Sequence, residues 1–185
     1  MEKKHNIGLV IGRFQPMHKG HEKIIRTALD TCSYVIVVVG STNKRHTLEN
    51  PLNGGLRMWH VRHCFMEEYR MGRLVVVGIP DRVEVRNDSS WGEYVMEKIA
   101  EVTNLVPSIV FEGQESVRKD WYSSIGLEVV HVDRNELKIS GTEMRYAVLR
   151  GDKEFYLANC ATGMEEYYDE LKEELENAAK NASSN

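Results

Sequence analysis

Five short runs of apolar, mostly β-branched residues alternate along the chain with longer stretches of helical periodicity. The runs cover residues 7–11, 34–39, 74–77, 109–111 and 127–132. Continuous apolar runs are typical of strands that are buried on both faces, as in parallel sheets. Parallel strands need crossover connections, which are usually helices. The alternation therefore predicts an α/β fold with an open, doubly wound parallel sheet.

The segments between these runs supply the expected helices. Residues 55–70 and 91–103 have helical patterns. The helix after the first run has one buried face, made by Ile24, Ile25, Ala28, Leu29 and Cys32.

The acidic stretch from 163 to 185 is also helix-prone, with Tyr167, Leu171 and Leu175 spaced four residues apart. We expect one domain over residues 1–162. We expect residues 163–185 to form a C-terminal helix with a frayed end, packed on that domain or on a neighbouring subunit.

Charge and cysteine content limit the possible partners and compartment. The chain of 185 residues has 28 acidic and 24 basic residues, a net charge of −4. Proteins that coat nucleic acid usually carry a basic excess, so we expect no nucleic-acid partner. No apolar run approaches the roughly 20 residues that span a bilayer, so we expect no membrane partner. Three cysteines without a Cys-x-x-Cys pair favour reduced thiols in a cytoplasmic protein.

The turn between the first run and the first helix carries the most chemistry. It reads GRFQPMHKGH over residues 12–21. In open α/β sheets, ligands bind beyond the carboxyl ends of the strands, and the free N–H groups of a helix start attract phosphate. His18 and His21 are three residues apart, which places both rings on one side of the helix start. Arg13 and Lys19 add positive charge, and Gly20 would let a ligand approach the backbone. The turn therefore predicts a phosphate-handling site.

Other interpretations of this turn are weaker. A zinc site would need further ligands, and no Cys, Asp or Glu close in the sequence completes His-x-x-His. The Gly-x-Gly-x-x-Gly turn of dinucleotide-binding folds is absent. A pair of surface histidines at a helix start would leave the neighbouring cations unexplained.

A second segment, ISGTEMR over residues 139–145, follows the fifth run. Ser140 and Glu143 fit a capping box at a helix start. The capping box does not explain Thr142 or Arg145. A hydroxyl and a guanidinium at one helix start favour a second phosphate-binding element.

Together, GRFQPMHKGH and ISGTEMR resemble the two motifs of the HxGH nucleotidyltransferase superfamily, in the expected order. The first is especially similar to its form in archaeal-type nicotinamide mononucleotide (NMN) adenylyltransferases. The stretch Asn87-Asp88-Ser89-Ser90-Trp91 resembles the Asn-Asp-x-x-Trp segment of that family. The resemblance runs from about residue 7 to about residue 151. It implies a Rossmann-like nucleotidyltransferase fold and transfer of AMP from ATP to NMN, which gives NAD and pyrophosphate.

The resemblance also implies roles for individual residues. The catalytic residues would be His18, His21 and Arg145. ATP would contact Gly12, Arg13, Phe14, His18, Lys19, Gly20, His21, Gly113, Ser140, Gly141, Thr142 and Arg145. NMN would contact Gly40, Ser41, Asp81, Asn87 and Trp91, with the indole stacked on the pyridinium ring and the Asn87 amide paired with the carboxamide. Mg²⁺ would arrive with ATP, without a metal site of the protein's own. A homo-oligomer, a trimer or hexamer, is typical of the family.

One position departs from the family pattern, and several alternatives stay open. Family members commonly read Gly-Glu-Arg where this chain has Gly55-Leu56-Arg57. Nicotinate mononucleotide could replace NMN, and a related adenylyl- or cytidylyltransferase would use another acceptor such as pantetheine phosphate. A fragment similar to class I aminoacyl-tRNA synthetases and a non-catalytic nucleotide sensor are more distant alternatives.

Overall fold

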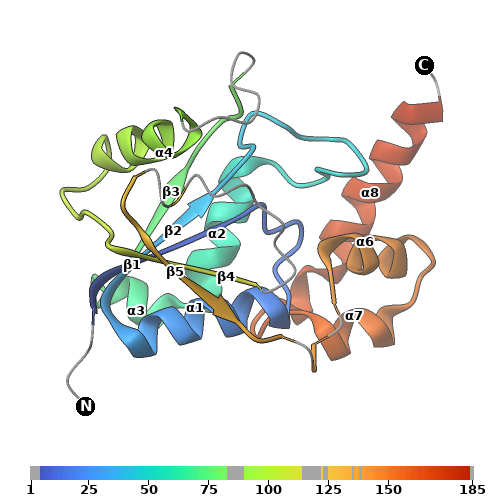
Figure 1. Ribbon diagram of the computed structural model, residues 1–185. Helices are drawn as coiled ribbons and strands as arrows, with labels where there is room; N and C mark the ends of the chain where they lie inside the picture. Colours follow the sequence, from blue (N-terminus) through green and yellow to red (C-terminus); the bar gives the residue numbers. More distant parts are fainter. Residues whose placement is uncertain are drawn as a thin grey trace.

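The computed structural model describes residues 5–82, 90–113, 122, 125–134, 136–137 and 139–183. Its centre is a parallel sheet with the strand order β3-β2-β1-β4-β5 (Figure 1). The strands are β1 (His5–Gly12), β2 (Cys32–Val39), β3 (Leu74–Gly78), β4 (Ile109–Gly113) and β5 (Glu128–Val132). The direction of winding reverses between β1 and β4, which is where such folds bind their ligands. The predicted doubly wound α/β architecture is confirmed.

The central strands are apolar on both faces because each face of the sheet carries its own core. Along β2, Val35, Val37 and Val39 belong to one core, whereas Ile36 and Val38 belong to the other. All five of these side chains are fully buried. Successive residues of a strand point to opposite faces, so an uninterrupted apolar run is what a doubly covered strand requires.

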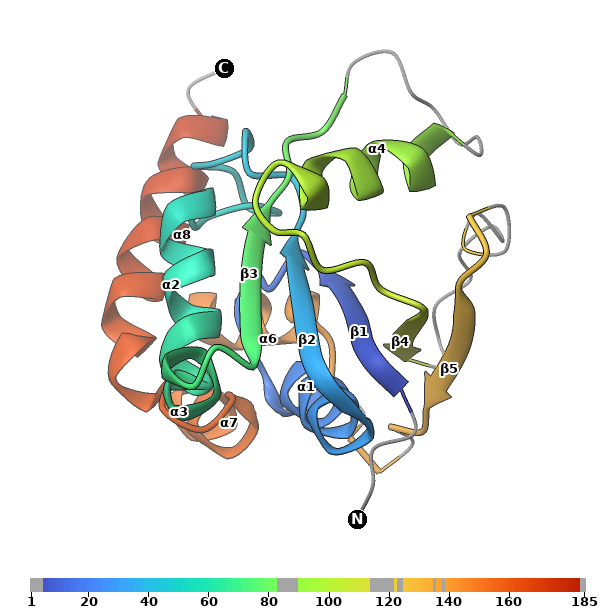
Figure 2. The ribbon, with the colours of Figure 1, turned by 90° about the vertical axis from the view of Figure 1, so that its left-hand side faces the viewer.

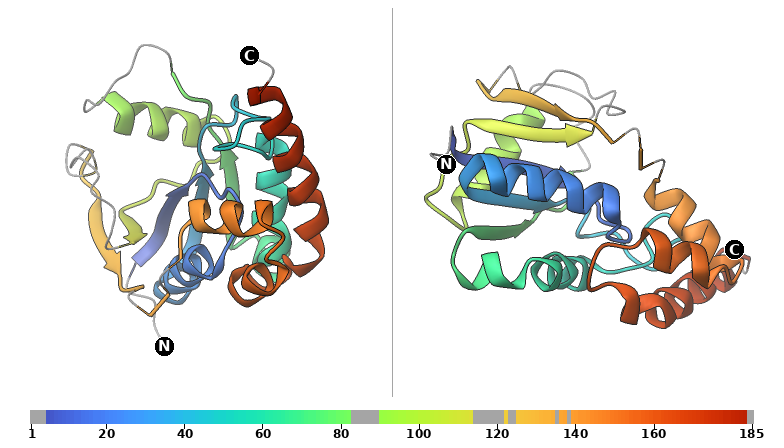
Figure 3. Two further views of the ribbon diagram at one scale, coloured as in Figure 1. Left: turned by 90° about the vertical axis from the view of Figure 1, so that its right-hand side faces the viewer. Right: turned by 90° about the horizontal axis from the view of Figure 1, so that it is seen from below.

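Helices cover the two faces unequally (Figures 2 and 3). The larger core contains residues of α1 (Lys19–Thr31), α2 (Gly54–Cys64) and the C-terminal helix α8 (Tyr168–Ser183). The short helix α3 (Met66–Arg70) follows α2 on the same side. The smaller core lies under α4 (Ser90–Ala100).

The C-terminal part adds α6 (Gly141–Leu149), α7 (Lys153–Asn159), the 3-10 turn η1 (Glu165–Tyr167) and α8. Leu171 and Leu175 of α8 are buried in the larger core. The helix is therefore held by apolar contacts with its own chain. The division into residues 1–162 and 163–185 stays a prediction.

Two helix predictions need correction. The expected helix over 55–70 is two helices, because Phe65 takes φ −127° and ψ 40° between them. Its ring is fully buried, and the Arg26 guanidinium lies 4.6 Å from the ring centroid. Burying this side chain interrupts the helix. The helix expected over 91–103 ends at Ala100.

Three further differences come from tertiary contacts. Cys32 begins β2 directly after α1, so its burial belongs to the strand and not to the helix face. β5 is an edge strand, and of its residues only Val132 is buried. In the tail, Tyr168 rather than Tyr167 is buried alongside Leu171. Helix α7 was not expected from the sequence. Among the described residues, none of the helices is both long and apolar enough to span a bilayer.

Candidate functional site

The turn that joins β1 to α1 is fixed by contacts with the loop after β2. Phe14 is buried with a positive φ of 51°. The Gln15 side chain, also buried, donates to the Leu52 carbonyl at 2.7 Å and accepts from the Leu52 N–H at 3.1 Å. The turn is therefore held in place before any ligand binds.

Arg57, on α2, strengthens the same junction. Its guanidinium is fully buried and donates to four backbone carbonyls at 2.7–3.2 Å, those of Arg13, Gly40, Ser41 and Leu52. Burial and the charge of Arg13 lower the Arg57 pKa to about 10, so the group stays protonated near neutral pH. The guanidinium ties the turn after β1 to the end of β2.

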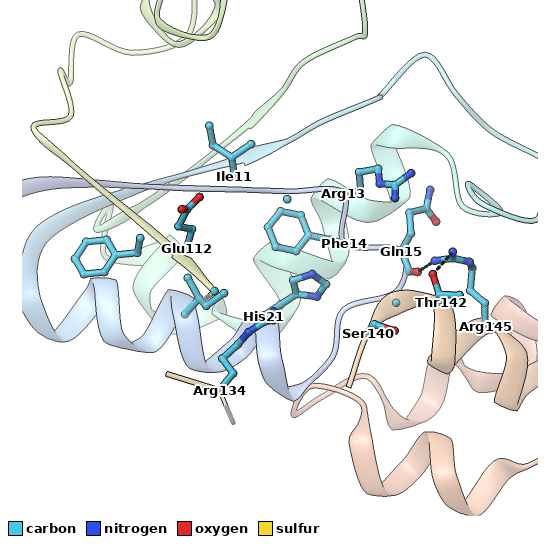
Figure 4. A pocket seen from close by; sticks show the side chains of 15 residues that line it. Ile11, Arg13, Phe14, Gln15, His21, Glu112, Arg134, Ser140, Thr142 and Arg145 are labelled. Carbon is cyan, nitrogen blue, oxygen red and sulfur yellow. Dashed lines mark hydrogen bonds between the residues drawn. The ribbon is translucent and has the colours of Figure 1, made fainter. Parts of the chain in front are cut away.

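A cavity of about 460 Å³ opens beside this turn (Figure 4). It lies at the carboxyl ends of β1 and β4 and at the starts of α1 and α6. Its walls include nine of the residues assigned above to ATP: Gly12, Arg13, Phe14, His21, Gly113, Ser140, Gly141, Thr142 and Arg145. The two motifs, far apart in the sequence, thus face one cavity.

The two histidines of the first motif have different places. His21 lines the cavity, and the His18 ring stacks on it with centroids 3.7 Å apart. His18 is the N-cap residue of α1 and is buried. Burial, and secondarily the charge of Arg134, lower the His18 pKa to about 3. His18 is therefore neutral near pH 7 and backs His21, which faces the cavity.

The second motif begins α6 as expected. Ser140 and Glu143 form the predicted capping box, with the Ser140 N–H donating to the Glu143 carboxylate at 2.7 Å. Arg145 is buried and donates to the Gln15 carbonyl at 2.7 Å and to the Thr142 hydroxyl at 3.1 Å. Burial and the charge of Arg13 lower the Arg145 pKa. These bonds join α6 directly to the turn after β1.

A smaller cavity of about 230 Å³ adjoins the first and shares Arg13, Thr142 and Arg145 with it. Its other lining residues are Leu48, Glu49, Tyr146 and Leu149. Together the two cavities have a strongly cationic end, which suits a chain of phosphates.

Besides His18, two other residues assigned to ATP, Lys19 and Gly20, do not line the cavity. The Lys19 ammonium donates to the Ala158 carbonyl of α7 at 2.6 Å. The space beside Gly20 is occupied by other side chains: a Cβ there would lie 2.8 Å from Arg134 Nη1 and 3.0 Å from the His18 ring. In this structure the Arg134 guanidinium and the His18 ring fill this space, and the expectation that Gly20 makes room for a ligand at the backbone stays a prediction.

Three residues assigned to NMN gather at the ends of β2 and β3. Gly40 and Ser41 are held by Arg57, and the Ser41 hydroxyl donates to the Asp81 carboxylate at 2.9 Å. Lys44 pairs with the same carboxylate at 2.7 Å. Trp91 begins α4, partly buried, with its ring 5.5 Å from that of Tyr94. Asn87 lies outside the described residues.

Several residues that line the cavity were not among those assigned to ATP from the sequence: Ile11, Gln15, Ile24, Phe111, Glu112 and Arg134. Gln15 was visible within the first motif. Glu112 and Arg134 follow apolar runs, and this place at the carboxyl end of a strand is a signal that could have found them. Among the described residues, no group of three or more His, Cys, Asp or Glu side chains is arranged to hold a metal ion.

Comparison with known proteins agrees with this geometry. The model of the cytidylyltransferase-like family matches residues 9–147. A nicotinamide-nucleotide adenylyltransferase of Pyrococcus abyssi is 32% identical over 96% of this chain and 91% of its own length. The Pyrococcus horikoshii protein of the same name is 31% identical over the same shares.

Solved structures support the fold. A bifunctional NMN adenylyltransferase/ADP ribose pyrophosphatase from Francisella tularensis superposes with a TM-score of 0.75 at 19% identity, over 96% of this chain. This chain spans about half of that protein, 54% of its length. The same enzyme was also solved with AMP and a manganese ion, with a TM-score of 0.71.

The two sequence motifs, their shared cavity and the match over most of the chain lead to one assignment. The chain belongs to the cytidylyltransferase-like family and, within it, to the archaeal-type NMN adenylyltransferases.

Proposed function

We propose that this enzyme transfers the AMP moiety of ATP to NMN and releases NAD and pyrophosphate. One observation carries the proposal: His21, Arg13 and Arg145 come from both motifs and line a single cavity at the switch point of the sheet. Relatives of this chain named for the same activity support it.

The reaction needs orientation and charge neutralisation more than acid–base chemistry. The NMN phosphate is ionised near pH 7, so it can attack the α-phosphorus without a strong general base. His21 would donate to oxygens of the α- and β-phosphates, with the neutral His18 ring holding it in place. Arg13 and Arg145 would balance the charge on the leaving pyrophosphate. We propose Gly12, Phe14, Gly113, Ser140, Gly141 and Thr142 as further ATP contacts.

Lys19 and Gly20 would help to fix the conformation of the turn between β1 and α1. The bond from Lys19 to the Ala158 carbonyl links the start of α1 to α7. Gly20 leaves the space that the Arg134 guanidinium takes.

The acceptor would bind at the ends of β2 and β3. Gly40, Ser41 and Asp81 form a hydrogen-bonded group there, and Trp91 begins the helix that follows β3. With Asn87, these residues would select NMN. We expect Trp91→Ala to raise KM for NMN more than KM for ATP, and equal effects on both would remove Trp91 from the acceptor site.

Mg²⁺ would enter as part of the substrate MgATP. A structural neighbour solved with AMP and a manganese ion supports the involvement of a divalent cation. We further propose that the enzyme works in the cytoplasm as a homo-oligomer, a trimer or hexamer. The three cysteines are free thiols, as a reducing compartment favours. Sedimentation of the purified chain tests the assembly.

The test is pyrophosphate release from MgATP with each candidate acceptor. We expect rapid release with NMN, together with formation of NAD. Faster turnover with nicotinate mononucleotide than with NMN would make nicotinate mononucleotide the preferred acceptor. Faster turnover with pantetheine phosphate would place the enzyme in a different pathway. Binding of ATP and acceptor without release would make the protein a nucleotide sensor.

A further inference from the structure

Among the described residues that line the cavity, Arg134 is a cation that lies outside both sequence motifs. It lies two residues after β5 and lines the main cavity. Figure 4 shows its side chain reaching toward His21 on the side away from Arg145. The cavity therefore has guanidinium groups on two opposite sides of His21.

Two glycines make the space that the Arg134 side chain occupies. A Cβ on Gly113 would lie 2.6–2.8 Å from three of its guanidinium atoms, Nη2, Nε and Cζ. A Cβ on Gly20 would lie 2.8 Å from its Nη1. Real Cβ atoms do not come so close to other heavy atoms. A side chain at either glycine would therefore make the Arg134 guanidinium shift away from the first turn of α1 or the end of β4.

The charge of Arg134 acts at the start of α1. It is the second cause, after burial, of the lowered pKa of His18. The N-terminal turn of a helix already favours anions through its free N–H groups and dipole. A fixed cation beside Gly20 strengthens that preference on the His21 side of the cavity.

We infer that Arg134 is a further catalytic residue, which donates to a non-bridging oxygen of the α-phosphoryl group from the side opposite Arg13 and Arg145. This inference rests on the proposed function. In that reaction a bond forms between an NMN phosphate oxygen and the α-phosphorus. The bond from the α-phosphorus to the bridging oxygen breaks, and its electron pair leaves with pyrophosphate. The equatorial oxygens of the α-phosphorus share the charge of the transition state, so a donor fixed beside them lowers the barrier.

The first test compares Arg134→Gln and Arg134→Lys with Arg150→Gln, which removes an exposed arginine at the end of α6. We expect kcat to fall about 100-fold in Arg134→Gln and less in Arg134→Lys. Arg150→Gln should keep the wild-type kcat. A kcat for Arg134→Gln within about twofold of wild type overturns the inference.

A second readout separates contact with the phosphoryl group from a structural role. The two diastereomers of ATP with sulfur on the α-phosphorus place that sulfur on different non-bridging positions. If Arg134 donates to one of these oxygens, Arg134→Gln should change the ratio of kcat/KM for the two diastereomers about tenfold. A lower kcat with an unchanged ratio would make Arg134 a structural residue and overturn the inference.

The close approach of Gly113 to the Arg134 guanidinium allows a double-mutant test. Gly113→Ala should displace the guanidinium and reduce kcat in the wild-type background. In the Arg134→Gln background the same change should have little further effect, because the displaced group is already gone. Additive losses would contradict the inference. If a thermal melt shows that Gly113→Ala does not fold, the kcat values of Arg134→Gln, Arg134→Lys and Arg150→Gln decide whether Arg134 is catalytic.

Binding of ATP without acceptor keeps this inference separate from the proposed function. If the wild type makes no NAD from ATP and NMN, the proposed function fails. Arg134→Gln should still raise Kd for MgATP about tenfold, whereas Arg150→Gln should not. An unchanged Kd together with unchanged turnover removes Arg134 from the phosphate site.

Discussion

Two histidine pairs with the same spacing have opposite surroundings. His18 and His21 stand at the start of α1, and His60 and His63 lie on α2. Each pair has one buried ring with a lowered pKa, to about 3 at His18 and about 4 at His60.

The neighbours of the two pairs differ. In the first pair, His21 lines the cavity together with three arginines, and the charge of one of them, Arg134, helps to lower the His18 pKa. The second faces the acidic side of the C-terminal segment. His60 Nε2 lies 4.0 Å from the Glu170 carboxylate, and His63 Nε2 lies 3.4 Å from that of Glu166. The spacing of two histidines therefore does not distinguish the pairs, whereas the cavity and the converging cations make the first pair the candidate site.

Arg57 links the surroundings of the two histidine pairs. It lies on α2 one turn before His60, and it donates to the Arg13 carbonyl in the turn before α1. We expect Arg57→Ala to lower the free energy of unfolding by roughly 3–5 kcal/mol, because the change leaves buried carbonyls without their donor. Urea denaturation measures this loss. A destabilisation below about 1 kcal/mol would mean that the turn after β1 is held by other contacts.

The clearest contrast between the pairs is in catalysis. His21→Ala should lower kcat by roughly 100-fold or more, the range for losing one transition-state donor. His63→Ala, the matched change in the second pair, should leave kcat within about twofold of wild type. Pyrophosphate release measures both. An unchanged kcat in His21→Ala would refute its role in the reaction.

In the second pair, His60 should make the free energy of unfolding depend on pH. The His60 pKa is lowered from 6.5 to about 4, mainly by burial and then by the charge of His63. The unfolded chain takes up this proton below pH 6.5, whereas the folded chain resists until about pH 4. The stabilisation is therefore complete above pH 6.5 and is lost as the pH falls towards 4. We expect a loss of roughly 2–3 kcal/mol.

The control for this pH effect is His60→Gln, which cannot titrate. Its free energy of unfolding should fall less between pH 7 and pH 4.5 than that of the wild type. Some acid sensitivity should persist, because the His18 pKa is lowered in the same direction. Identical pH profiles for the two proteins would show that His60 does not govern the acid response.

Among these predictions, the smallest effect on the free energy of unfolding is expected for an exposed ion pair on the acidic side of α8. His46 and Glu174 form a half-exposed pair at 3.1 Å between the loop after β2 and α8. Exposed pairs contribute roughly 0–1 kcal/mol, so Glu174→Gln should change the free energy of unfolding by less than about 0.5 kcal/mol. A larger loss would mean that α8 is held chiefly by charge rather than by Leu171 and Leu175.

Much of the site could be predicted from the sequence because its key groups are close together in the chain. The turn from Gly12 to His21 and the capping box at Ser140 are short segments whose residues meet through local geometry. Lys19 shows the limit of this reasoning. Its position in the motif suggests a phosphate contact, but in the structure its ammonium contacts the Ala158 carbonyl, 139 residues later.

By itself, the sequence determined the parallel sheet, the capped start of α6 and the positions of the two motifs, since apolar periodicity and short-range hydrogen bonds act within a few residues. Tertiary structure alone decided which groups converge. Arg145 donates to the Gln15 carbonyl across 130 positions, and Arg134 fits between two glycines from different elements. Such contacts depend on how the strands and helices pack, and no local pattern in the chain records that packing.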